Sequence, residues 1–90
     1  MNEKNEELFA YQRKLKFRAW HRGTREMDLL MGSFADRHVM NMDYAALQEF
    51  EALLSCNDPD LYNWVTKQAV PPANHMSAIL EKFLQHKIVE

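Results

Sequence analysis

A run of charged residues around a glycine is the part of this sequence best suited to binding another molecule. Residues 22–28, with the sequence RGTREMD, lie between two segments that show helical periodicity. Arginine suits the bidentate recognition of carboxylates and phosphates, and glycine suits the left-handed backbone that often follows a helix end. We therefore predict an exposed corner between two helices that presents charge to a partner. The candidate binding residues are Arg22, Gly23, Arg25, Glu26 and Asp28.

The same corner also fits a purely structural role. Gly23 could simply end the first helix. Glu26 would then lie in the first turn of the next helix, where a carboxylate favours the helix dipole or closes a capping box. This alternative leaves unexplained why arginines stand so close to Gly23 on both sides.

A second run, residues 58–64 with the sequence DPDLYNW, holds further candidate residues. Asp58 can cap a helix, Pro59 suits its first position, and Asp60 favours its positive N-terminus. The two acids could instead form a contact edge, although the capping role is favoured. Trp64 follows Leu61 at helical spacing and is expected to anchor the core. The secondary candidate residues are Asp58, Asp60 and Trp64.

Catalytic and metal-binding chemistry find little support in the sequence. The single Cys56 has no obvious histidine beside it and is expected to be an inert thiol. The four histidines show none of the spacings typical of helical metal sites. Two glycines nine residues apart cannot build a dinucleotide-binding loop. We therefore expect no catalytic residue, no metal site and no enzymatic activity. The histidines are His21, His38, His75 and His86.

Composition indicates one small domain that spans residues 1–90. The chain is 47% hydrophobic and 27% charged, which is typical of a globular protein. A lone cysteine excludes an internal disulfide and indicates a reducing compartment. No apolar run approaches the roughly 20 residues of a membrane span, and the acidic N-terminus lacks the apolar stretch of a signal peptide. These features predict a protein of the bacterial cytoplasm without membrane insertion.

The charge is unevenly distributed along the chain. Residues 1–25 hold seven Lys and Arg against three Glu, whereas residues 26–90 hold four against ten acids, so the net charges are +4 and −6. Such a field steers encounters with a partner. The basic segment 11–25 also contains Tyr11, Phe17 and Trp20, a combination that could bind nucleic acid. The pI near 6.1 argues against a nucleic-acid partner.

Helical periodicity predicts an all-α fold, a single small five-helix bundle. Phe9, Phe17 and Trp20 lie off the main apolar stripe of the first helix, so either other helices surround it or part of it awaits a partner. Gly32, inside the second helix, indicates close packing against a neighbour. Asp43 and Asn74 are the expected N-caps of the third and last helices. The first two expected helices span about 6–22 and 24–40, and the last spans about 74–88. The third begins at Asp43, and the short fourth holds Leu61, Trp64 and Val65.

Both runs resemble the motifs of one protein family. The first run fits Arg-Gly-x-x-Glu-x-Asp and the second fits Asp-x-Asp-Leu-aromatic-x-Trp, in the order and at the distance found in the SdhE, or succinate dehydrogenase assembly factor 2, family. The resemblance covers roughly residues 13–68. Members commonly carry a second arginine before the motif arginine, and His21 stands there in this chain.

The resemblance implies a five-helix assembly factor that promotes covalent flavin attachment. Such a protein binds the flavoprotein subunit of succinate dehydrogenase, and often that of fumarate reductase, without a stably bound cofactor of its own. In that subunit a histidine nitrogen becomes bonded to the 8α carbon of FAD. Arg22 and Gly23 would then project into the client near the flavin, and Glu26 would orient Arg22 or contact the client. A generic helical adaptor is the main alternative, and a nucleic-acid-binding module is the third.

Overall fold

The computed structural model describes residues 3–87 and confirms the all-α prediction. Within these residues it contains five α-helices and two short 3₁₀ turns, with no strand. The helices are α1 (Glu3–Trp20), α2 (Arg25–His38), α3 (Tyr44–Leu54), α4 (Asp58–Val65) and α5 (Ala78–Gln85), and the 3₁₀ turns are η1 (Val39–Asn41) and η2 (Ala73–His75). No helix among the described residues has the length and apolar character needed to cross a membrane.

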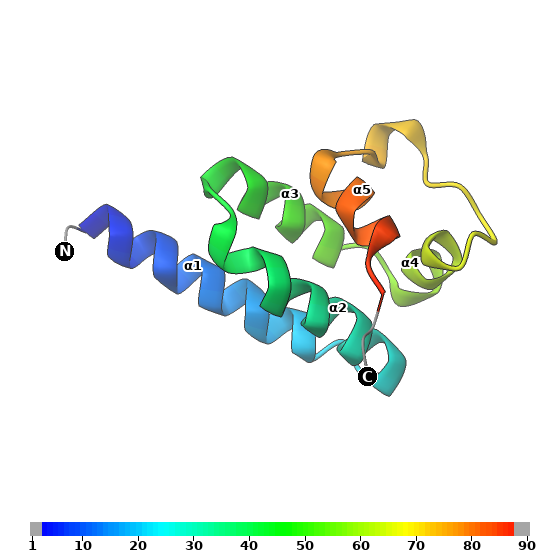
Figure 1. The fold of residues 1–90 in the computed structure, drawn as a ribbon, viewed down its shortest axis with the longest axis horizontal. Helices are drawn as coiled ribbons and strands as arrows, with labels where there is room; N and C mark the ends of the chain where they lie inside the picture. Colours follow the sequence, from blue (N-terminus) through cyan, green and yellow to red (C-terminus); the bar gives the residue numbers. More distant parts are fainter. Residues whose placement is uncertain (1–2, 88–90) are drawn as a thin grey trace.

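The helices form an elongated body with principal extents of 45 × 29 × 20 Å. In Figure 1, α1 and α2 lie side by side as a helical hairpin that turns at residues 21–24. α3 packs against α1, and α5 packs against both α3 and α4. The turn of the α1–α2 hairpin therefore lies toward the same end of the molecule as α4 (Figure 1).

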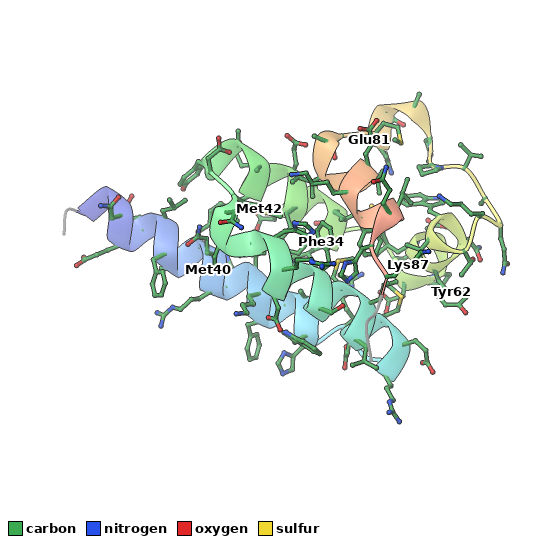
Figure 2. The ribbon with its side chains drawn as sticks, in the orientation of Figure 1. Phe34, Met40, Met42, Tyr62, Glu81 and Lys87 are labelled. Carbon is green, nitrogen blue, oxygen red and sulfur yellow. The ribbon has the colours of Figure 1, made fainter. Side chains whose placement is uncertain are left out.

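One apolar core joins all five helices. Phe34 of α2 is fully buried at its centre, with ring centroids 5.7 Å from Phe50 of α3 and 5.4 Å from Phe83 of α5. Figure 2 shows Phe34 in the middle of the molecule, between these elements. Leu15 of α1 and Leu61 of α4 are also fully buried. Because every helix contributes a buried side chain, the packing of α4 and the corner of the hairpin depend on the same core.

α1 is apolar on two sides for two different reasons. Trp20 covers Gly32 of α2 so closely that a Cβ on Gly32 would overlap the indole ring, which confirms the predicted close packing. The indole Nε1 donates to Asp36 at 3.1 Å. Phe9 and Phe17, by contrast, remain 47% and 64% exposed. Part of the first helix is therefore not covered by the described remainder of the chain.

Two polar contacts that the sequence did not predict fasten α1 to its neighbours. The buried Gln12 side chain donates to the carbonyls of Val39 and Met42, at 3.3 and 3.2 Å, where the chain passes from α2 to α3. The Tyr11 hydroxyl donates to Glu51 of α3 at 2.6 Å. Burial and this carboxylate together raise the pKa of Tyr11 to about 12. These contacts fix the position of α1 relative to α3 and to the segment between α2 and α3.

Two predicted N-caps, Asp58 and Asn74, are wrong, whereas the N-cap predicted at Asp43 is confirmed by its bond from Ala46 N. The last helix begins at Ala78 rather than about residue 74, because Met76 is extended and Ser77 accepts the bond from Leu80 N. Asn74 lies in the preceding 3₁₀ turn and caps nothing. The last part of the predicted span, residues 88–90, lies outside the described residues.

α4 is capped by Asn57 and not by Asp58. The Asn57 side chain accepts from Asp60 N at 2.9 Å, and its own backbone is extended. Asp58 and Pro59 are therefore the first two residues of the helix, where a missing proline N–H costs nothing. This shift leaves the Asp58 carboxylate free to bind something other than its own helix.

Candidate functional site

The predicted corner is a tight loop between α1 and α2. Gly23 has a φ of 120°, in the region that disfavours residues with a Cβ. A Cβ built on Gly23 would nevertheless meet no protein atom within 4 Å. Thr24 caps α2 by accepting from Met27 N at 3.3 Å. Gly23 is therefore required by the backbone conformation, and its outer side faces open space.

Asp28 holds this loop from inside the protein. One carboxylate oxygen, Oδ1, accepts from the backbone N–H of Arg22 at 2.6 Å and from that of Gly23 at 3.1 Å. These bonds replace the helical hydrogen bonds that α1 would otherwise continue to make, which explains why it ends at Trp20 and not at the predicted residue 22. Asp28 is thus a positioning residue of the corner.

Contrary to the prediction, the Arg22 side chain does not project outward. Its side chain is only 11% exposed, and its Nη2 lies 2.8 Å from Asp58 Oδ1. Nε also donates to Asp58 Oδ1 at 2.9 Å, while Nη1 donates to the carbonyl of Leu54 and Nη2 to that of Cys56 at 2.7 Å. The last carbonyls of a helix lack helical partners, and here the guanidinium satisfies the end of α3. The prediction of an exposed Arg22 is wrong because this cluster of acceptors draws it inward.

The Arg22–Asp58 ion pair joins the two sequence motifs into one structural unit. It ties the corner before α2 to the start of α4, 36 residues further along the chain. Asp60, in the first turn of α4, is exposed. Trp64 is 5% exposed, which confirms it as a core anchor. The second motif therefore holds the first in place through Asp58 and contributes Trp64 to the core.

The exposed part of the site is small. Gly23, Thr24, Arg25 and Glu26 are exposed. Among the described residues, neither Arg25 nor Glu26 takes part in an ion pair. Glu26 does not orient Arg22, since that role falls to Asp58. The corner consequently presents one unpaired cation and one unpaired anion beside a glycine on a rigid mount.

Cys56 and two of the histidines lie in surroundings typical of structural residues. Burial, with the nearby Asp60 as a second cause, raises the pKa of the Cys56 thiol, in keeping with an inert cysteine. His86 is buried, with Nε2 2.8 Å from Ser33 Oγ, and burial lowers its pKa. His38 lies beside it, with ring centroids 6.4 Å apart. Nothing in the sequence spacing signalled this histidine pair, and the described residues contain no group of three or more potential metal ligands.

Known proteins resemble this chain over most of its length. A family model described as "Flavinator of succinate dehydrogenase" matches residues 13–87. The mitochondrial succinate dehydrogenase assembly factor 2 of Dictyostelium discoideum is 34% identical over 86 residues, 96% of this chain and 60% of the relative. The FAD assembly factor SdhE of Acetobacter pasteurianus is 35% identical over 78 residues, 87% of this chain and 72% of the relative. The chain thus spans about three fifths of the first relative and nearly three quarters of the second.

Proposed function

Because the chain belongs to the flavinator family of succinate dehydrogenase, we propose that it binds the flavoprotein subunit of that enzyme and promotes covalent attachment of FAD to a histidine there. The fumarate reductase flavoprotein is proposed as a second client. The relatives carry names of assembly factors, which agrees with a helper protein rather than an enzyme. The relatives include a bacterial and a mitochondrial protein. The bacterial cytoplasm stays a prediction for this chain.

The observation that carries this proposal is the set of internal contacts that hold the corner. Arg22, Asp28 and Asp58 are all engaged within the protein and fix the loop from two directions. Gly23, Arg25 and Glu26 are left exposed on that support. Because glycine has no Cβ, Gly23 allows close approach to a client backbone, and the flanking charges supply specificity.

The proposed mechanism is selective binding. The flavin, held by the client, supplies the chemistry of bond formation. A small helper can favour that step by binding more tightly to the client conformation in which the histidine and the flavin are correctly placed. We propose that Arg25 and Glu26 contact the client and that no FAD is stably bound by this chain.

A reconstitution experiment tests the proposed function. The flavoprotein subunit of succinate dehydrogenase, purified without covalent flavin, is incubated with FAD with and without this protein. In-gel flavin fluorescence after denaturation measures the covalent product. We expect a clear increase with the protein present. Equal fluorescence in both reactions, together with no detectable complex, would contradict the proposal.

Neutralising Glu26 should separate function from stability. Glu26→Gln removes the charge of an exposed side chain that has no ion-pair partner among the described residues, so the free energy of unfolding should change by less than about 1 kcal/mol. Covalent flavin attachment should nevertheless fall. Glu81→Gln, at an exposed glutamate on α5, is the matched control and should leave both quantities unchanged. Normal flavin attachment by Glu26→Gln would remove this carboxylate from the site.

The basic first helix should speed association with the client, but only some of its cations should contribute. Lys16 pairs with Asp36 and Arg18 pairs with Glu51, both at 3.3 Å, so two cations are partly neutralised within the protein. Arg13 and Lys14 are exposed. Changing these two to glutamine should lower the association rate and flatten its salt dependence, with little effect on the dissociation rate. Stopped-flow binding at low and high salt measures this, and a wild-type association rate that ignores salt would contradict it.

A further inference from the structure

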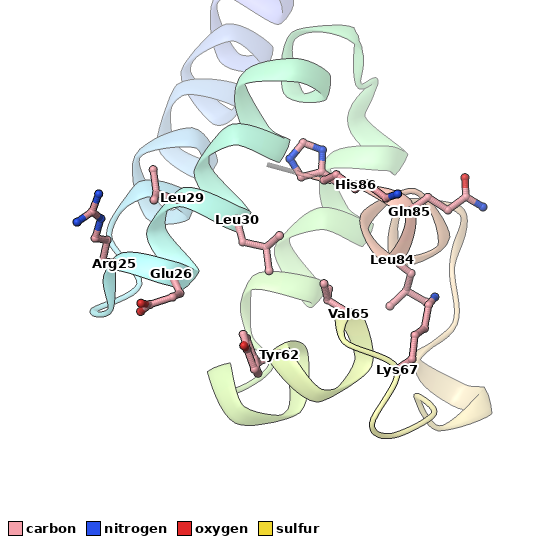
Figure 3. Close-up of a pocket in the computed structure, with 11 residues that line it drawn as sticks. Arg25, Glu26, Leu29, Leu30, Tyr62, Val65, Lys67, Leu84, Gln85 and His86 are labelled. Carbon is pink, nitrogen blue, oxygen red and sulfur yellow. The ribbon is translucent and has the colours of Figure 1, made fainter. Parts of the chain in front are cut away.

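A groove opens beside the corner, on the side toward α4 and α5. It has a volume of about 830 Å³ and lies between the first half of α2, α4 and the end of α5. Figure 3 shows Leu30 and Val65 facing each other across it, with Leu84 on the α5 side. The floor is therefore apolar, and its edge on α2 includes Arg25 and Glu26 of the proposed binding site.

Tyr62 is a residue of the second motif that the fold does not explain. Its neighbours in the motif, Leu61 and Trp64, are buried in the core, but Tyr62 is 46% exposed at the edge of the groove. Figure 3 places it on α4, below Leu30 and Val65. Tyrosine supplies large contact area at low entropic cost and is enriched among residues that dominate interface energies. Arg25 and Glu26 of the first motif and Tyr62 of the second thus line one groove.

The charge of the lining indicates what kind of segment the groove accepts. Lys67 and Lys87 are exposed lining residues, and Figure 3 shows Lys67 beside Leu84. Residues 26–90 carry a net charge of −6 with these lysines included, so two lysines in one lining are a local exception on this part of the chain. Lys67 also has a φ of 65°, a conformation more usual for glycine or asparagine. Lysines around an apolar floor complement an acidic segment with apolar side chains.

We infer that this groove binds a segment of the client that inserts apolar side chains between α2 and α4 and carries carboxylates that pair with Lys67 and Lys87. This inference rests on the proposed function, because the client is the flavoprotein subunit. The groove adds a second contact to the corner. Gly23, Arg25 and Glu26 face the client at one point, and the groove holds an acidic segment next to it.

Binding to the flavoprotein subunit tests the inference with a matched pair of tyrosines. Tyr62→Glu places a negative charge in the groove and should weaken binding, raising the dissociation constant by about tenfold or more. Tyr44→Glu changes a tyrosine of α3 that is 54% exposed and outside the groove, and it should leave the affinity unchanged. Circular dichroism checks that both variants are folded. Equal affinities for Tyr62→Glu and wild type would overturn the groove while leaving the proposed function intact.

Photo-crosslinking identifies the occupant directly. A benzoylphenylalanine at position 62 should capture a client peptide with a net negative charge and apolar residues, and the same probe at position 44 should not. Capture of a basic client peptide, or of a second copy of this chain, would overturn the inference. Wild-type protein that neither binds the flavoprotein subunit nor raises its flavin content would overturn both the groove and the proposed function.

Discussion

Replacing Gly23 with leucine should strongly reduce covalent flavin attachment while lowering the free energy of unfolding by only about 1–3 kcal/mol. The stability loss comes from the backbone alone, because φ is 120° and a Cβ at this position meets no protein atom within 4 Å. The functional loss comes from the client, since a leucine side chain would occupy the space in which the client backbone approaches. We expect the rate of flavin attachment to fall at least about tenfold, as small misplacements at a reacting site carry large penalties.

Gly23→Ala is the matched control for this prediction. Alanine and leucine share the same backbone penalty, and neither side chain meets a protein wall, so the two variants should have similar melting temperatures. Their activities should differ, with alanine retaining more flavin attachment than leucine. Equal activities at equal stability would show that Gly23 serves only the turn, and the structural alternative for the corner would then stand.

The elements of this fold could be predicted from local patterns. Leu15 lies on a stripe with helical spacing, Asp43 caps as expected, and Trp64 is the buried anchor of a short helix. Each of these features depends on residues close together in the chain. Helix ends were less accurate where two caps competed. Asn57 next to Asp58 and Ser77 close to Asn74 are examples, because either residue type can accept the bond and only the tertiary structure selects one.

The hydrogen bonds and the ion pair that hold the site together could not be predicted from local patterns. The partner of Arg22 is 36 residues away, and two further acceptors are backbone carbonyls, which carry no signal in the sequence. The bond from the buried Gln12 to Val39 O could not be predicted for the same reason, because its acceptor is a distant backbone carbonyl. The motif match singles out Arg22 and Asp58, but it does not say that the two lie against each other. In the structure the Arg22 side chain holds the corner from within, whereas the sequence predicted that it projects outward.

Arg22→Ala should therefore lower the free energy of unfolding by about 2–4 kcal/mol, well beyond the value of an exposed ion pair. The substitution removes the partner of Asp58, whose side chain is only 24% exposed, and leaves the carbonyls of Leu54 and Cys56 without their donors. Chemical denaturation measures the loss. A change below about 1 kcal/mol would return Arg22 to the exposed role expected from the sequence.

A double-mutant cycle with Asp58→Ala isolates the contribution of the ion pair. Asp58→Ala should cost less than Arg22→Ala, because the guanidinium keeps its two carbonyl acceptors. The double variant should cost less than the sum of the two single variants, since both remove the same interaction. Asp58→Ala should also reduce flavin attachment under conditions where it is fully folded, although Asp58 belongs to α4 and not to the exposed corner. Normal flavin attachment by this variant would separate the second motif from the function of the first, because the corner would then keep its geometry without the ion pair.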